Sequence, residues 1–327
     1  MAGGKGADSM ARLKVKKKRS KGKRLSYLKK AAPLYLMLVP AVVIIFIYCY
    51  IPMAGNIIAF QKFSAAKGLF SDKQTWVGFD NFRYIFSMKN TYQVLYNTVF
   101  ISFFKIILSI VVPLIVALLL NEVTKSWYKR TVQTIIYFPY FISWVILSGI
   151  LFDILSPSTG IINSILGVFN IEPIYFLGSE KAFPWVIIIS DTWKNYGFNT
   201  ILYLTAITSV SQDLYESAAM DGAGILKRMR HVTIPGILPI IILTAVLSMG
   251  SILNAGFEQV FNLATPTVYT TGDIIDTLVY RMSIGASGGA SQYSAATAIG
   301  LFKSVVSFIM ISTGYCLAKR YADYKVF

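Results

Sequence analysis

The sequence has few of the residues that enzymes use for catalysis. It contains one histidine, His231, and two cysteines, Cys49 and Cys316, among 327 residues. A Ser/His/Asp or Cys/His site needs a histidine base, and His231 lies in a basic stretch with no cysteine nearby. The cysteines fall inside long apolar stretches, which indicates neither a disulfide framework nor a metal site. We therefore expect no catalytic residue and no bound metal.

The sequence also lacks a phosphate-binding motif and has few charged residues. The pattern GxxxxGK[ST] is missing, so we do not expect this chain to bind or hydrolyse ATP itself. Only 14% of the residues are charged, whereas 55% are hydrophobic. This composition is atypical of soluble proteins and favours an integral membrane protein.

The formal net charge of +16 is concentrated at the N-terminus. Twelve of the 31 Lys and Arg residues fall within the first thirty positions, including the run from Lys14 to Arg24. Such a run can bind nucleic acid, but its place directly before an apolar stretch favours a cytoplasmic tail beside anionic lipid. A signal peptide is the third interpretation. The apolar stretch 33–60 is long enough to span a bilayer and has no small-residue cleavage site, so we predict a retained first helix after a tail at 1–32.

Stretches long enough to cross the hydrocarbon, about twenty mostly apolar residues, occur six times. They are 34–59, 94–120, 133–155, 184–209, 236–257 and 295–318. With the N-terminus inside, 21 Lys and Arg lie in inner segments and seven in outer ones, as the positive-inside rule requires. We predict an all-α membrane domain at 33–319 and a cytoplasmic tail at 320–327.

Two outer segments have distinct compositions. The segment 61–92 contains WVGFDNFRYIF, in which aromatic residues alternate with turn residues, and this is typical of a folded interfacial loop. The segment 258–294 is rich in Gly, Ser and Thr and contains GASGGAS at 285–291. We expect the second segment to be long and mobile.

Polar residues inside the predicted spans are a further signal, because they are unfavourable in lipid and normally face protein or water. The fourth span carries four on one helical face: Asp191, Lys194, Asn195 and Asn199. They form either a self-neutralising Asp191–Lys194 pair or the lining of a passage for a hydroxyl-rich solute. A similar cluster ends the fifth span: Asn254, Glu258 and Gln259. Three further polar residues lie singly in the predicted spans, and helix packing or snorkelling of the side chain to the membrane surface explains them. They are Lys105, Asp153 and Lys303.

A polar, basic stretch at 211–239 separates the fourth and fifth spans on the predicted cytoplasmic side. Its pattern predicts a short helix from Leu214 to Asp221, capped by Asp213 with Glu216 three residues on. Glycines break this helix, and a second short helix is expected at 225–232, stopped by Pro235 and Pro239. Small side chains on its surface allow close approach of a partner, although an amphipathic loop on the membrane is the alternative.

These residues resemble the coupling loop in permease subunits of binding-protein-dependent ABC importers. That loop reads EAA, three residues, G, nine residues, then I-x-L-P. Here the matching positions are Glu216, Ser217, Ala218, Asp221, Gly222, Val232, Ile234 and Pro235. The departures, Ser217 for Ala, Met229 for an aromatic residue, and Val232 and Ile234 for Ile and Leu, keep size or apolarity.

Other stretches resemble the carbohydrate group of these permeases, in particular the LplB type, which is similar to the maltose and alginate permeases. They are VGFDNFRYIF after the first span, YNTVFIS entering the second, and the C-terminal YADYKVF. The resemblance implies the type I ABC importer permease fold, with six transmembrane helices and a cytoplasmic coupling-helix loop. It implies a multi-pass protein of the bacterial plasma membrane with both termini cytoplasmic.

The resemblance also implies partners and sites. This chain would pair with a second permease, dock onto one of two ATPase subunits that hold ATP and Mg, and receive an oligosaccharide or polysaccharide fragment from an external binding protein. The implied ATPase-docking residues are Glu216, Ser217, Ala218, Ala219, Asp221, Gly222 and Ala223. Candidate residues of the substrate path are Asp191, Trp193, Lys194, Asn195, Tyr196, Asn199, Asn254 and Glu258, with Tyr203 as a further aromatic. An ABC permease for another solute, such as peptide, and a secondary transporter that needs no ATPase are the alternatives.

Overall fold

The computed structural model describes residues 31–64, 67–69, 71, 73–284 and 290–321. The chain separates into two units, Met1–Ile57 and Ile58–Phe327. Most of the predicted N-terminal tail, the GASGGAS stretch apart from its last two backbone positions, and the last six residues lie outside the described residues.

A single apolar helix begins in the first unit and ends a few residues into the second. It runs from Ala31 to Phe60, a length of 30 residues that suffices to cross a membrane. One turn widens into a π-helix at Phe46–Tyr50 (η1), α2 follows at Ile51–Met53, and the end tightens into a 3-10 helix at Ala54–Phe60 (η2). The predicted first span at 34–59 is thus confirmed as a helix of spanning length.

Three helices of the second unit are also long and apolar enough to cross a membrane. They are α4 (Thr91–Asn121), the continuous helix Ile225–Met249, and Gln292–Arg320 within α15 (Ala290–Tyr321). These helices cover the predicted spans 94–120 and 295–318. The predicted span 236–257 is too long at its C-terminal end, because the helix stops at Met249 and a turn with irregular backbone follows.

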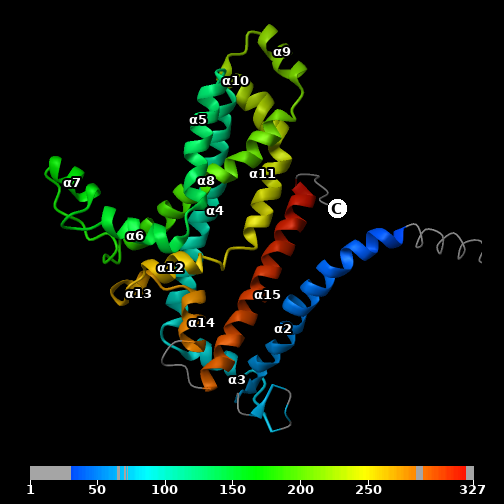
Figure 1. Ribbon diagram of the computed structural model, residues 1–327, viewed down its shortest axis with the longest axis vertical. Helices are drawn as coiled ribbons and strands as arrows, with labels where there is room; N and C mark the ends of the chain where they lie inside the picture. Colours follow the sequence, from blue (N-terminus) through cyan, green and yellow to red (C-terminus); the bar gives the residue numbers. More distant parts are fainter. Residues whose placement is uncertain (1–30, 65–66, 70, 72, 285–289, 322–327) are drawn as a thin grey trace, which may run out of the picture. The chain divides into compact units, whose positions relative to one another are not determined.

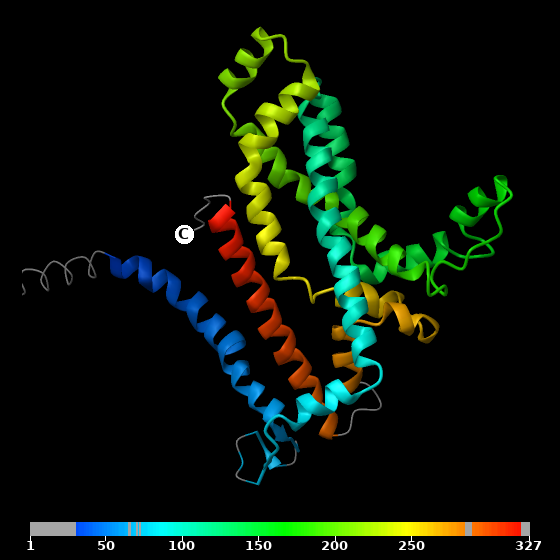
Figure 2. The same cartoon turned by 180° about the vertical axis from the view of Figure 1, so that it is seen from behind.

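The predicted third span at 133–155 is wrong as a single helix. Helix α5 (Ser126–Tyr137) runs into the short 3-10 helix η4 (Phe138–Phe141), and α6 (Trp144–Ile154) then leaves at a bend of 102° (Figures 1 and 2). Pro139 restricts its predecessor and cannot donate a helical hydrogen bond. Ser143 starts the new helix, since its side chain accepts the backbone N–H of Ile146 at 3.3 Å.

The predicted fourth span corresponds to α8 (Phe183–Thr208), a helix of 26 residues. Its length suffices to cross a membrane, but its polar residues keep it outside the helices that are apolar enough by composition. The described chain therefore contains four such helices, or five with the bent pair α5–α6. Helix α8 packs along α4, which gives it a protein partner for its polar face (Figures 1 and 2).

Three apolar clusters hold the second unit together. One lies where α3 (Asp80–Ser87), α4, α14 (Ile275–Ser283) and α15 meet, around Ile85 and Ile299. The second joins α4 and α8 to α12 (Phe257–Leu263), around Ile101 and Val260. The third joins α4 and α8 to α11 (Ile234–Met249), around Tyr203 and Ile237.

The described residues of segment 61–92 are folded, as predicted. Strand β1 (Gln61–Lys62) pairs antiparallel with β2 (Thr75–Trp76), and α3 follows. The side chain of Asn81 donates to the carbonyls of Ala59 and Gln61 at 2.8 and 3.0 Å, which fastens α3 to the end of the preceding helix.

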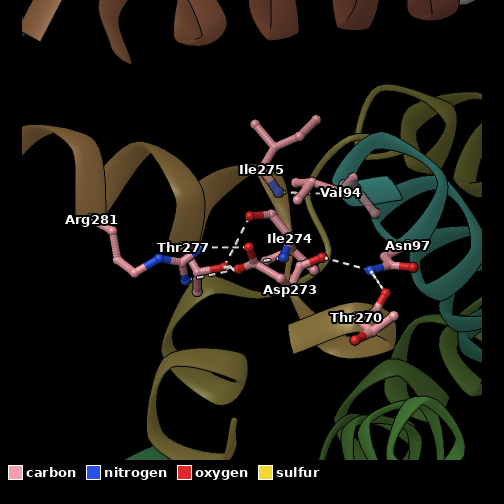
Figure 3. A network of polar contacts seen from close by, with 9 residues as sticks. Val94, Asn97, Thr270, Asp273, Ile274, Ile275, Thr277 and Arg281 are labelled. Carbon is pink, nitrogen blue, oxygen red and sulfur yellow. Dashed lines mark hydrogen bonds and ion pairs between the residues drawn. The ribbon is translucent and has the colours of Figure 1, made fainter. Parts of the chain in front are cut away.

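The expectation that segment 258–294 is mobile is wrong for residues 258–284. These residues form α12, the short η6 (Pro266–Val268), α13 (Tyr269–Gly272) and α14. Figure 3 shows how polar contacts tie them to α4. The amide of Asn97 donates to the carbonyls of Thr270 and Asp273 at 3.0 and 3.2 Å, and the hydroxyl of Thr98 accepts the N–H of Ile275 at 2.9 Å. Composition does not show that the backbone groups of this segment have side-chain partners on α4.

An ion pair closes the same network (Figure 3). The guanidinium of Arg281 binds both carboxylate oxygens of Asp273, and Thr277 donates to the same carboxylate at 2.6 Å. Burial acts to lower the pKa of Arg281, but the hydrogen bonds and charge of Asp273 outweigh it and raise the pKa. The pair therefore remains charged and links α13 to α14.

Helices α5 and α8 approach each other closely at Gly197. A Cβ atom there would lie 1.9 Å from the carbonyl oxygen of Ile136. We expect Gly197→Ala to lower the free energy of unfolding by about 1–3 kcal/mol, because backbone must move to admit the methyl group. Thermal unfolding of the purified protein in detergent measures this effect.

Gly149 in α6 is the matched control, because a Cβ added there meets open space. We expect Gly149→Ala to leave the unfolding midpoint unchanged or to raise it, since alanine is the better helix former. Equal destabilisation by both substitutions would contradict the proposed close crossing.

Candidate functional site

The stretch 211–239 begins with helix α9 (Gln212–Met220). The predicted cap Asp213 is wrong: Ser211 is the N-cap, and its side chain accepts the N–H of Asp213 at 3.3 Å. Both residue types are good caps, and Ser211 takes this position with a non-helical backbone (φ −58°, ψ 132°). Asp213 instead occupies the first turn, where its negative charge interacts favourably with the helix dipole.

The predicted glycine break is confirmed at Gly222. Its φ of +76° lies in the left-handed region that glycine adopts readily. The N–H of Gly222 bonds to the carbonyl of Ala219 at 3.0 Å, and that of Ala223 to the carbonyl of Ala218 at 2.9 Å. This pair of bonds is the Schellman motif, which ends a helix and reverses the chain.

The predicted second helix, 225–232, is not a separate short element. α10 (Ile225–Arg228), a π-helical turn η5 (Met229–Thr233) and α11 form one helix of 25 residues. Pro235 and Pro239 do not stop it, contrary to the prediction. Pro235 sits in the first turn of α11, just after the π turn, where the irregular hydrogen bonding accommodates the missing N–H.

The small residues of α9 and its turn lie at the surface. Glu216, Ser217, Ala219, Asp221 and Gly222 are exposed, whereas Ala218 and Ala223 are half-buried. Large apolar side chains surround them, with Leu214 54%, Met220 89% and Leu226 78% exposed. Such a patch at a helix–turn–helix end is suited to burial against another protein.

Helix α8 carries the predicted polar residues, but Asp191 and Lys194 do not pair with each other. Asp191 lies 3.5 Å from the ammonium of Lys105 on α4. Lys194 is buried and donates instead to the carbonyl of Tyr140 at 2.6 Å, where the helix bends between α5 and α6. Residues three apart on α8 therefore face different neighbours, because α4 and the bend pack on different sides of the helix.

Lys105 is the centre of a polar network, defined by Lys105, Asp191, Gln259 and Ser190, that sequence reasoning missed. Its ammonium donates to the carbonyl of Ala255 at 2.7 Å and to the side chain of Gln259 at 2.5 Å. Gln259 is fully buried and donates to the carbonyl of Ile187 and to Ser190, both at 2.8 Å. Helices α4, α8 and α12 meet at this network.

In the sequence its members are polar residues in or beside three apolar stretches. Position along the chain makes Lys105 look isolated and groups Gln259 with Asn254 and Glu258, and only the tertiary arrangement brings these polar side chains together. Lys303, which position along the chain also makes look isolated, pairs with Asp276 of α14 at 2.5 Å.

The other candidate path residues of α8 differ in accessibility. Asn195, Tyr196 and Asn199 are half-buried, and the side chain of Asn195 donates to the carbonyl of Asp191 at 3.0 Å. Tyr203 is buried and hydrogen-bonded to Thr244 at 2.9 Å, so its ring is not free to stack on a solute.

Trp193 faces an apolar hollow that the charged and amide side chains of α8 do not line. It is 45% exposed, and the hollow has a volume of about 700 Å³ between α6, α7 (Ile161–Val168) and α8. Of the polar network, Ser190 lines this hollow beside Trp193, whereas Lys105, Asp191 and Gln259 do not.

Asn254 and Glu258 flank the start of α12. Both are exposed, whereas Ala255 and Gln259 beside them are buried. Gly256 between them has a φ of +95°, and a Cβ there would come within 3.1 Å of the Lys105 ammonium. The polar network thus fixes the backbone that presents Asn254 and Glu258. Within the described residues, no three His, Cys, Asp or Glu side chains gather to form a metal site.

Comparison with known proteins gives relatives along almost the whole chain. Protein LplB of Bacillus subtilis (strain 168) is 41% identical over 309 residues, which cover 94% of this chain and 95% of that protein. The polygalacturonan/rhamnogalacturonan transport system permease protein YteP of the same organism is 37% identical, covering 90% of each chain.

The fold has solved counterparts of similar length. A chain from the crystal structure of a bacterial ABC transporter involved in the import of the acidic polysaccharide alginate superposes with a TM-score of 0.82 at 36% identity. The match covers 91% of this chain and 99% of that chain. Residues 109–323 match the family described as binding-protein-dependent transport system inner membrane component. These likenesses span the α4–α15 framework and the exposed α9 element alike, and the chain belongs to this family of multi-pass membrane transport components.

Proposed function

We propose that this chain is the membrane-spanning permease subunit of an ATP-driven ABC importer that moves an oligosaccharide or polysaccharide fragment across a bacterial plasma membrane. The observation that carries the proposal is the exposed α9 helix ending at Gly222. It presents small and apolar side chains at the end of a membrane helix, in a chain that has no P-loop of its own.

In this proposal α9 is the coupling helix. Glu216, Ser217, Ala218, Ala219, Asp221, Gly222 and Ala223 form its docking surface for one of two ATPase subunits, which hold ATP and Mg. Small side chains allow the ATPase groove to approach the helix backbone closely. Lys and Arg placement supports a cytoplasmic position for α9 and for both chain termini.

The substrate assignment is supported by the relatives. YteP is described as a polygalacturonan/rhamnogalacturonan permease, and another relative as an arabinooligosaccharides permease. A solved counterpart is an alginate transporter in complex with alginate pentasaccharide-bound periplasmic protein. We infer that an external binding protein delivers glycan to this chain and a second permease. The amides of Asn195, Asn199 and Asn254 and the carboxylate of Glu258 are exposed or half-buried and are suited to binding sugar hydroxyls, beside the Asp191 carboxylate that Lys105 holds.

The test is uptake by cells that express the chain with its neighbouring transport genes. We expect radiolabelled oligosaccharide to accumulate only with the chain, the binding protein and ATP all present, and an ATPase with a P-loop to copurify with the chain. A peptide of similar mass is the matched solute control.

Two outcomes contradict the proposal in different ways. Uptake of the peptide instead of the oligosaccharide rejects the carbohydrate assignment but keeps the ABC mechanism. Gradient-driven uptake by the purified chain alone in proteoliposomes, without ATP, rejects the importer mechanism itself.

A further inference from the structure

Helix α9 is fastened to the base of α11 by one hydrogen bond between side chains. The hydroxyl of Tyr215 donates to that of Thr233 at 3.0 Å. Thr233 is only 1% exposed, and its own hydroxyl faces the carbonyl of Arg228 at 3.5 Å. The chain of contacts therefore runs from the middle of α9 into the last residue of the π turn η5.

A second contact fixes the segment that leads into α9. A Cβ added to Gly236, in the first turn of α11, would lie 2.8 Å from a methyl group of Val210. Val210 follows α8 and directly precedes the cap Ser211. The start of α9 is thus packed against α11, and Tyr215, one turn further along, is hydrogen-bonded to it.

The hydrogen bond from Tyr215 reaches the π turn η5, which runs directly into α11. The N–H of Ile234 bonds to the carbonyl of Met229, five residues back, which defines the wide turn. Pro235 follows immediately, and its missing N–H weakens the helix ladder there. A turn of this kind deforms more readily than regular α-helix and occurs frequently at functional sites.

We propose that Tyr215 is the positioning residue that transmits movement of the docked α9 to the membrane helix α11, through its hydrogen bond to Thr233. This inference rests on the proposed function of α9. The ring of Tyr215 is half-buried, while the docking residues Glu216, Ser217 and Ala219 point to the surface. Loss of the hydroxyl therefore leaves the docking surface intact and removes the link behind it.

The experiment compares the assembled importer carrying Tyr215→Phe with the wild-type complex in proteoliposomes. Binding-protein-stimulated ATP hydrolysis and oligosaccharide uptake are measured on the same sample. We expect the ATPase to copurify in normal amount, while sugar transported per ATP hydrolysed falls by about five- to tenfold, the equivalent of one lost hydrogen bond.

Matched variants separate transmission from folding. Thr233→Val removes the other hydroxyl and should have the same effect. Thr233→Ser keeps the hydroxyl, so the sugar transported per ATP hydrolysed should stay at the wild-type value. Tyr128→Phe removes a hydroxyl from an exposed tyrosine of α5 and should change nothing.

The outcomes distinguish this inference from the proposed function. A normal transport ratio in Tyr215→Phe, with the ATPase bound, overturns the transmission role and leaves docking untouched. Failure of the wild-type chain to bind any ATPase overturns the docking role on which the inference depends.

Discussion

Replacing Ala219 with glutamate is expected to reduce binding-protein-dependent uptake by at least about 100-fold while the protein stays in the membrane. Ala219 is exposed on α9, so the new side chain meets no obstacle within this chain. In the docked complex the carboxylate would be buried against the ATPase without a partner, which costs several kcal/mol. The measurements are uptake and the amount of ATPase that copurifies.

Ala219→Ser is the matched control for this substitution. It adds a small neutral group at the same position, and we expect uptake and ATPase binding to stay within about twofold of the wild type, as for most surface changes. Normal ATPase binding by Ala219→Glu would argue against α9 as the docking element.

Replacing Lys105 with methionine should destabilise the protein more than any other single change considered above. It leaves the Asp191 carboxylate and the Gln259 oxygen without their shared cation, and Asp191 is only 23% exposed. Breaking a buried ion pair by removing one partner costs about 3–5 kcal/mol. The melting temperature of the purified protein in detergent measures the loss.

Two further variants test whether the uncompensated charge is the cause. The double variant Lys105→Met/Asp191→Asn should regain part of the stability, because it removes the unpaired carboxylate. Arg83→Met breaks the exposed pair with Asp80 and should leave the melting temperature unchanged. A double variant as unstable as Lys105→Met alone would contradict the electrostatic explanation.

The sequence predicts α4 and α15 well because each is one predominantly apolar run of spanning length, with a single lysine inside the predicted span. The same composition fails at 133–155, since apolar character does not tell which way a chain turns at Pro139. Nor could composition show that residues 258–284 fold into helices, because their backbone partners Asn97 and Thr98 lie far away in the chain.

In α9 and the turn that follows it, local sequence rules account for the turn but not for the residues at which the helices begin and end. Gly222 was predictable because the left-handed conformation strongly favours glycine. Ser211 and Asp213 are both suitable caps, and the backbone of the whole loop selects between them. The continuation of α10 into α11 depends on the π turn, for which the sequence carries no clear signal.

The polar network shows the limit of reasoning from spacing along one helix. The i, i+3 relation of Asp191 and Lys194 suggested a pair, yet α4 supplies a nearer cation from 86 positions earlier. The roles predicted for the path and docking residues remain predictions, because they depend on partners that bind this chain.

The Lys105 network also has a consequence for the order of events during synthesis. Gln259 follows Lys105 by 154 positions, and at about 5–20 residues per second this is a delay of roughly 8 to 30 s. Asp191 arrives earlier and can neutralise the lysine, but the amide and the Ala255 carbonyl come later. When α4 is made, two of the final partners of its lysine have therefore not yet been translated, and the packing around Lys105 is complete only when the last third of the chain emerges.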